Sequence, residues 1–338
     1  MNEFLQSKFW NFAPALKEQF TVSSVIFVAA VIAISGILIA YLRKRKKVDE
    51  KMSQELYLRW RSWVWIALLL FAPILMGPGW VIVGVCLLSL LCYREFAKVT
   101  GVFRERSIST VVVLGILLLT FASLDNFFRL FAATLPLSVA AISIISILKD
   151  QPKGYLQRTA LGVLGFIFFG YCLGYMGYFA NSPTFRPIII LIILCVELND
   201  VFAFCCGKLI GGPKAIPNTS PGKTWSGCIG ALVCTTLTVC VLGHFVFLGT
   251  KADHWAHLIF MGMSLSIIGQ FGDLLLSSIK RDVGIKDMGN LIPGHGGLLD
   301  RFDSLVLLPP AALHYLSIIL DTPIGEEPGV ITRFFTGS

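Results

Sequence analysis

Residues 187–206 read PIIILIILCVELNDVFAFCC, an apolar run that carries two carboxylates, Glu197 and Asp200. An α-helix needs about 20 apolar residues to cross the hydrocarbon core of a bilayer. Runs of this length recur along the 338-residue chain, which is 55% hydrophobic and only 14% charged. A soluble domain has about 25% charged residues, and open sheet edges could not satisfy their hydrogen bonds in lipid. The sequence therefore predicts an all-α, polytopic integral membrane protein.

Ten transmembrane helices are expected from these runs. The first follows an ordinary amphipathic stretch and is long enough to be an anchor, not a cleaved signal peptide. The second and third are short and are joined by Gly77-Pro78-Gly79, which favours a tight helical hairpin, with a re-entrant pair as the alternative. Glycines in the sixth permit close helix packing. The expected spans are 22–42, 62–76, 79–93, 107–124, 127–148, 159–180, 187–206, 226–248, 256–279 and 304–320.

The distribution of Lys and Arg predicts the orientation of these spans. Cytoplasmic loops carry an excess of basic residues. The loops that share one side of the ten expected spans hold 22 of the 28 Lys and Arg residues. We therefore expect both termini outside and the basic loops in the cytoplasm, with a bacterial inner membrane as the location. The basic loops are 43–61, 94–106, 149–158, 207–225 and 280–303.

The chain divides into three regions on these patterns. Residues 1–60 are expected to form an additional anchor and a basic linker, 61–320 a polytopic catalytic domain, and 321–338 a short tail. The nine cysteines show no CxxC spacing and lie almost entirely in apolar runs. A zinc site or a disulfide framework is therefore not expected.

Three carboxylates are candidates for a metal site near the cytoplasmic face. Asp273 lies about two turns inside a membrane helix, where a lone carboxylate is costly and needs a cation. Asp300 and Asp303 are three residues apart, a spacing that places two side chains on one face of a helix. Convergence of the three would form an oxygen-rich site for Mg²⁺, and clustered Asp would allow a second cation.

Basic residues around these carboxylates are suited to binding phosphates. Lys280, Arg281, Lys286 and Arg301 carry the charge, and the glycine-rich segment 293–297 offers backbone N–H groups to an anion. A hard cation beside phosphate-binding cations indicates phosphoryl or nucleotidyl transfer. His295 within that segment is either a proton carrier or a structural residue.

A second polar group joins the seventh span to the eighth. Glu197 and Asp200 lie three apart on a helix, and Ser220-Pro221-Gly222-Lys223-Thr224-Trp225 follows at the start of the next. Gly222-Lys223-Thr224 imitates the end of a P-loop. However, Pro217 replaces the first glycine of that motif and no strand is expected before it, so a P-loop is rejected. A Lys-Thr-Trp turn at a helix start remains a reasonable anion contact.

The stretch from Ser277 to Asp303 resembles the signature of the phosphatidate cytidylyltransferase (CDP-diglyceride synthase) family. A second block of the family is matched by Asp200, Ala203-Phe204, Gly207-Lys208 and the 220–227 segment. Gly222 and Ser226 depart there from a Lys and a Glu of the family pattern, which puts the lipid and nucleotide contacts in question. The matching signature positions are Ser277, Lys280, Arg281, Lys286, Asp287, Gly289, Ile292, Pro293, His295, Gly296, Gly297, Asp300, Arg301 and Asp303.

The resemblance implies a nucleotidyltransferase of phospholipid biosynthesis that converts CTP and phosphatidate into CDP-diacylglycerol and pyrophosphate. Its expected partners are CTP, phosphatidate and membrane lipid, without nucleic acid, and a homodimer is the candidate assembly. The implied catalytic residues are Lys280, Arg281, Lys286, Asp287, His295 and Arg301. The implied substrate-binding residues are Asp200, Ser220, Lys223, Thr224, Ser277, Gly296 and Gly297. The implied metal ligands are Asp273, Asp300 and Asp303.

Two other functions are compatible with parts of this pattern. A CTP-dependent lipid kinase would use similar equipment but would transfer the γ-phosphate. A transporter would use intramembrane carboxylates as ion sites, but it would need them along a path to both faces, whereas here the charges cluster on one side.

Overall fold

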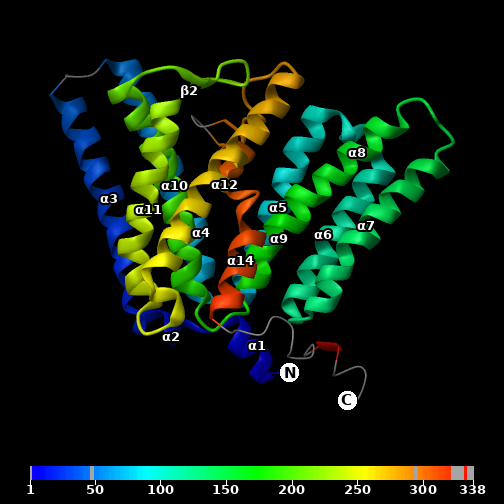
Figure 1. Ribbon diagram of the computed structural model, residues 1–338, viewed down its shortest axis with the longest axis horizontal. Helices are drawn as coiled ribbons and strands as arrows, with labels where there is room; N and C mark the ends of the chain where they lie inside the picture. The colour runs from blue at the N-terminus through cyan, green and yellow to red at the C-terminus, as the bar shows by residue number, and fades with distance from the viewer. Residues whose placement is uncertain (1, 46–48, 293–295, 321–330, 333–338) are drawn as a thin grey trace.

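A bundle of long apolar helices forms this protein. The computed structural model describes residues 2–45, 49–292, 296–320 and 331–332 (Figure 1). Within these residues, ten helical segments are long and apolar enough to cross a membrane. The predicted all-α polytopic fold is confirmed, and each of the ten expected spans corresponds to one segment.

The spans have the following bounds. They are α3 (Gln19–Lys44), α4 (Glu50–Met76), α5 (Pro78–Thr100), α6 (Arg106–Leu124), α7 (Phe128–Leu148), the segment Tyr155–Phe179, α10 (Phe185–Ile210), α11 (Trp225–Phe247), α12 (Trp255–Asp282) and the segment Leu299–Ile319. Segment Tyr155–Phe179 consists of α8 (Tyr155–Gly165), a π-helical stretch Phe166–Cys172 and α9 (Leu173–Phe179). Segment Leu299–Ile319 consists of α13 (Leu299–Phe302), a 3₁₀ turn Asp303–Leu305 and α14 (Leu308–Ile319).

The second and third spans form the expected tight hairpin, because α4 ends at Met76 and α5 begins at Pro78. Both helices are longer than predicted, so a re-entrant pair does not describe them. α4 begins at Glu50, and much of the expected loop 43–61 is therefore helical. α5 likewise continues to Thr100 through part of the expected loop 94–106. Polar residues extend both helices beyond the apolar stretch, where hydropathy gives no sign of a helix.

The helices form two groups that meet at the last span. α10, α11 and α12 pack together on one side, and α5 to α9 pack together on the other (Figure 1). α14 contacts α12 and α9, so it lies between the groups. Because successive spans alternate in direction, all five basic segments lie at one end of the bundle, here called the basic end.

A small β-hairpin covers part of the basic end. β1 (Lys214–Ile216) pairs antiparallel with β2 (Ser220–Thr224), the two strands of the described chain. The hairpin connects α10 to α11, and the Trp225 N–H donates to the Pro213 carbonyl at 3.1 Å. The expected turn at 220–225 is therefore a strand that leads directly into a helix.

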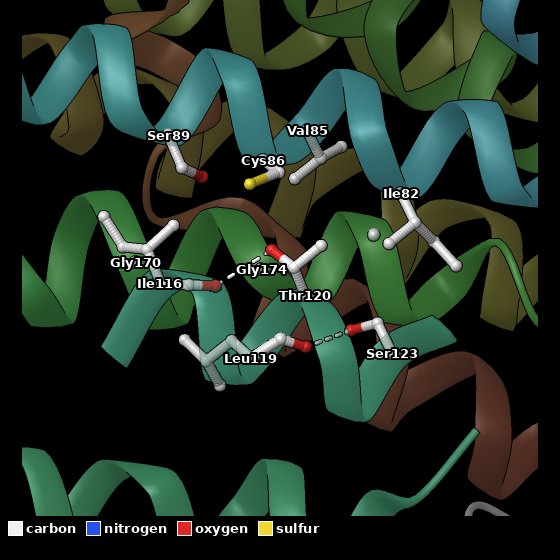
Figure 2. A pocket seen from close by; sticks show the side chains of 11 residues that line it. Ile82, Val85, Cys86, Ser89, Ile116, Leu119, Thr120, Ser123, Gly170 and Gly174 are labelled. Carbon is white, nitrogen blue, oxygen red and sulfur yellow. Dashed lines mark hydrogen bonds between the residues drawn. The ribbon is translucent and has the colours of Figure 1, made fainter. Parts of the chain in front are cut away.

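Glycines bring α9 and its π-helical stretch close to α5 and α6. A cavity of about 10 Å³ lies between these helices. Figure 2 shows the residues that line it, Gly170 and Gly174 among them. Thr120 and Ser123 donate their hydroxyls to carbonyls of their own helix, both at 2.9 Å. Such a cavity holds about one water molecule. We interpret this cavity as a small gap left by the packing of these helices, not as a ligand site.

Arg186 attaches the N-terminal segment to the bundle. This segment contains α1 (Asn2–Phe9) and α2 (Phe12–Lys17). The Arg186 side chain is 2% exposed, its Nε donates to the Ile74 carbonyl at 3.1 Å, and its Nη2 donates to the Asn11 carbonyl at 2.6 Å. Its Nη1 also lies 3.3 Å from Glu18. The first helices are therefore integrated with α4 and α10.

Candidate active site

Lys223 and Asp273 join the two polar groups that the sequence singled out. Lys223 Nζ on β2 lies 2.6 Å from Asp273 Oδ2 on α12, and both side chains are at most about a quarter exposed. The Ser277 hydroxyl donates to Asp273 Oδ1 at 3.3 Å, one helical turn further along α12. The expected helical face of α12 is therefore present, and the hairpin supplies its cation.

Three carboxylates from three elements lie in one electrostatic group. Asp303 interacts through charge with both Asp273 and Asp200, and Asp200 interacts with Asp273. The Ser304 hydroxyl donates to Asp200 Oδ2 at 3.0 Å, which connects α10 to the turn after α13. We call Asp200, Asp273 and Asp303 the carboxylate group.

Asp300 has a different environment from the one predicted. Its Oδ1 lies 2.9 Å from Lys280 Nζ, and its Oδ2 accepts the N–H groups of Met288 at 2.8 Å and Gly297 at 3.0 Å. These bonds fold the segment between α12 and α13 around the carboxylate. Asp300 therefore holds this connecting segment in position.

The predicted metal ligands Asp273, Asp300 and Asp303 have different partners in the structure, and their role as ligands stays a prediction. Among the described residues, no three His, Cys, Asp or Glu side chains are grouped closely enough to hold a metal ion as they stand, and this includes the carboxylate group. The prediction placed Asp300 and Asp303 on one face of a continuous helix. In the structure, α13 ends at Phe302 and a tighter 3₁₀ turn begins at Asp303. Asp303 consequently joins Asp273 and Asp200 instead of acting with Asp300.

Glu95 is a site residue that the sequence interpretation missed. It lies on α5, is 8% exposed, and accepts the N–H groups of Leu298 at 3.0 Å and Leu299 at 2.8 Å. These N–H groups lie at the start of α13, where a carboxylate also interacts favourably with the helix dipole. Glu95 thus positions the helical turn that carries Asp300.

Two glycines of the signature leave room for Glu95. A Cβ atom on Gly289 would lie 2.7 Å from Glu95 Oε1, and a Cβ atom on Gly297 would lie 2.7 Å from Glu95 Oε2. Real Cβ contacts are not this short, so any side chain at either position would displace the carboxylate. A Glu at the end of an apolar run was the one sign in the sequence that could have identified this residue. The prediction instead placed Glu95 at the start of the expected loop 94–106, and so gave it no role.

The remaining basic residues line the edge of this arrangement. Arg281 Nε donates to the Thr219 carbonyl of the hairpin at 3.2 Å. Lys286 and Asp287 are exposed on the segment after α12. Arg301 interacts through charge with Glu197 and Asp200, and its buried Nε has no hydrogen-bond partner among the described residues. Of these predicted catalytic residues, Arg301 interacts with the carboxylate group, whereas Arg281 contacts the hairpin.

Comparison with known proteins identifies the type of enzyme. A model of the cytidylyltransferase family matches residues 57–319. The chain belongs to the cytidylyltransferase family. It is therefore a nucleotidyltransferase, and the matched region contains the whole carboxylate group, Glu95 and the hairpin.

Individual relatives of this cytidylyltransferase cover most of its length. The phosphatidate cytidylyltransferase of Staphylococcus haemolyticus is 33% identical over 251 residues, 72% of this chain and 93% of the relative. That of Staphylococcus aureus strain COL is 31% identical over 254 residues, with the same two coverages. The uncharacterized protein YnbB of Escherichia coli K12 is 30% identical over 277 residues, 80% of this chain and 90% of the relative.

The hairpin positions of the cytidylyltransferase have mainly structural contacts. Thr224 is the N-cap of α11, and its hydroxyl accepts the Gly227 N–H at 3.1 Å. The Ser226 hydroxyl donates to the Gly211 carbonyl. Ser220 is half-buried and pairs with Ile216. Gly222 has open space where a Cβ would stand. Of the predicted binding residues in this hairpin, Lys223 is the one that meets the carboxylate group.

The glycine-rich segment of the cytidylyltransferase is described in part. Pro293, Gly294 and the predicted catalytic residue His295 lie outside the described residues. Gly296 has φ +84°, a left-handed conformation that favours glycine, and it pairs with Ile292 in an isolated β-bridge. Gly296 thus turns the chain toward Gly297 and Asp300.

The carboxylate group is chemically suited to a hard divalent cation. Carboxylates inside a membrane protein are costly unless cations accompany them. Lys223 with Asp273 is the one ion pair that the described residues form with this group. Three carboxylates therefore share one directly paired ammonium among the described residues. Oxygen ligands of this kind are the ones that Mg²⁺ prefers, and a Mg²⁺ site here stays a prediction.

Proposed function

We propose that this enzyme transfers the cytidylyl group of CTP to phosphatidate, giving CDP-diacylglycerol and pyrophosphate. The observation that carries the proposal is the 2.6 Å ion pair between Lys223 and Asp273, because it unites the two signature blocks. The names of the relatives from Staphylococcus support the same substrates. The basic end, which carries the site, would face the cytoplasm of a bacterial inner membrane.

The reaction is an in-line displacement at phosphorus. A phosphate oxygen of phosphatidate attacks the α-phosphorus of CTP, a new P–O bond forms, and the bond to the β-phosphate oxygen breaks to release pyrophosphate. Such transfers depend on positioning and on stabilisation of charge more than on covalent help from the protein. A phosphate monoester has a second pKa of about 6 and is largely dianionic near neutral pH. We therefore assign no general base.

The residues of this chain would divide between cation and anion binding. Asp200, Asp273 and Asp303 would hold a magnesium ion, which when bound neutralises charge on the nucleotide phosphates. Lys223 sits at the edge of this group and is available to a phosphate once a cation compensates Asp273. Arg281 and Lys286, both exposed at the basic end, would bind the remaining phosphate charge.

Lys280 and Asp300 would act together as a support for the site. Their ion pair is largely buried, with 11% and 5% of the side chains exposed. It fixes α12 against the connecting segment, so that Arg281 at the end of α12 lies beside the hairpin. Neither side chain needs to leave this pair for the displacement.

Two labelled forms of CTP test the reaction. Purified full-length protein in phosphatidate-containing nanodiscs should incorporate the α-³²P label into lipid and leave the γ-³²P label in pyrophosphate. Incorporation of γ-label instead would identify a CTP-dependent lipid kinase. Absence of both labels from lipid, with Mg²⁺ present and the protein folded, would refute the proposed substrate.

A further inference from the structure

A large apolar cavity adjoins the candidate site at α13. Its volume is about 570 Å³, and its walls come from α4, α5, α10 and the segment around α13. Among the residues that the structure describes, no charged side chain lines it. Ligand pockets in proteins typically measure about 300–1,000 Å³, so the cavity is large enough to hold part of a substrate.

The cavity is continuous with the signature segment. Leu298 and Phe302, which flank Asp300, line it together with Leu291 and Leu305. Asp303, the next residue after Phe302, instead belongs to the carboxylate group. Within one turn, the Phe302 side chain therefore faces the cavity and the Asp303 side chain belongs to the carboxylate group.

The opposite wall of the cavity is accessible from the surrounding bilayer. Trp65 and Leu69 on α4 and Leu87 on α5 line it while remaining 59%, 69% and 57% exposed. These helices lie in the membrane-spanning region, so the exposed side chains face lipid. A ligand could therefore enter sideways without passing through water.

The cavity is long enough to hold an extended acyl chain. Its lining residues on α4 run from Ser62 to Ile74, a distance of about 18 Å at a rise of about 1.5 Å per residue. Half of a hydrocarbon core of about 30 Å is about 15 Å. The lining reaches Ile74 on α4 and Trp80 on α5, close to the Gly77 turn at the end opposite the basic end. An acyl chain that enters beside α13 would therefore lie along α4 and point away from the basic end.

We infer that this cavity binds the acyl chains of the phosphatidate substrate while its phosphate reaches the site beside α13. This inference rests on the proposed function. Charge complementarity selects the occupant: an anionic head at Lys223 and Arg281 and an apolar tail along α4 and α5 require a ligand with both parts in one molecule. A purely apolar ligand would leave the adjoining cations unused.

Gly84 provides a way to fill the cavity. It lines the wall on α5, and a Cβ atom there would lie 3.7 Å from the Pro73 ring, an ordinary contact. Gly84→Trp should therefore fold and project its indole into the space. The matched control is Leu68→Trp, which adds an indole on α4 at an exposed position outside the cavity lining.

Photo-crosslinking tests the inference directly. Wild-type protein in nanodiscs would be irradiated with phosphatidate that carries a diazirine near the end of one acyl chain, and the adducts would be mapped by mass spectrometry. Adducts are expected in 62–91, to be displaced by unlabelled phosphatidate and not by phosphatidylcholine. Gly84→Trp should lower their yield about tenfold, within the range by which apolar pockets reject a misfit, whereas Leu68→Trp should not.

The outcomes separate this inference from the proposed function. Adducts mainly in α6, α7 or α11, or equal displacement by phosphatidylcholine, would overturn the inference even if the enzyme makes CDP-diacylglycerol. Specific adducts in 62–91 without any liponucleotide product would support the cavity and refute the reaction. As a second readout, Gly84→Trp should lower kcat/KM more for long-chain than for short-chain phosphatidate, with the KM for CTP unchanged.

Discussion

The Glu95 carboxylate on α5 accepts the backbone N–H of Leu299 at 2.8 Å, although the two residues are 204 positions apart in the chain. This bond connects the helix group of α5 to α9 with the segment that carries the signature. Because Leu298 donates to the other oxygen, both acceptor oxygens of the side chain are used. The position of α13 therefore depends on α5.

Glu95→Gln should reduce activity by weakening this connection. The amide offers one acceptor oxygen in place of two, and hydrogen bonds to charged groups contribute about 1.5–3 kcal/mol each. We expect kcat to fall about tenfold or more, with the variant still inserted and folded, as measured by label transfer and by thermal unfolding in nanodiscs. Glu105→Gln is the matched control, because Glu105 pairs with Lys149 away from the site. Equal losses in the two variants would contradict the role of Glu95.

Lys223 and Asp273 should show energetic coupling. Lys223→Met, Asp273→Asn and the double variant form a cycle, and contacting residues typically couple by about 0.5–3 kcal/mol. We expect each single variant to lose most of its kcat/KM for CTP and the double variant to lose less than the sum. Lys214→Met, on the exposed face of the same hairpin, should have little effect. Strict additivity would argue against a joint role.

Asp303 and Asp300 should respond differently to Mg²⁺. Asp303→Asn removes a charge from the carboxylate group, so more Mg²⁺ should be needed for half-maximal activity and Mn²⁺ binding followed by electron paramagnetic resonance should weaken. Asp300→Asn should lower kcat and thermal stability, because it disrupts the bonds with Lys280 and Gly297, while the Mg²⁺ dependence stays unchanged. The reverse pattern would restore Asp300 as the ligand.

Arg186 should be important for stability rather than for chemistry. Removing one partner of a buried ion pair typically costs about 3–5 kcal/mol, and Arg186 also bonds two backbone carbonyls. Arg186→Met is expected to lower the melting temperature substantially, while the surviving folded fraction keeps its KM for CTP. Arg129→Met, at an exposed position on α7, is the control. A raised KM without loss of stability would show that the prediction is wrong.

The membrane spans could be predicted from sequence because hydropathy reports directly on them. Each apolar run near 20 residues became one helical segment. The start of α4 at Glu50 could not be found this way, since a polar helix outside the bilayer has no hydropathic contrast with a loop.

The candidate site was only partly predictable, for geometric reasons. Asp273 with Ser277 followed from helical spacing within α12. The separation of Asp300 from Asp303 did not, because a change from α to 3₁₀ geometry within four residues leaves no pattern in the sequence. The partners of Glu95 are backbone N–H groups, which every residue except proline has, so no residue type marks them.

The adjacency of Phe302 and Asp303 has a consequence for the chemistry of any lipid that reacts here. Phe302 lines the apolar cavity, and Asp303, the next residue, belongs to the carboxylate group. The apolar and charged environments are therefore one residue apart along the chain. A substrate held there has its ester linkages at the boundary and its phosphate beyond it, so the distance between tail and phosphate is fixed by the lipid's own glycerol backbone. The enzyme would thus select lipids by the distance between their acyl chains and their phosphate. In a lipid with a longer spacer, the phosphate oxygen would not lie at the position where it attacks the nucleotide.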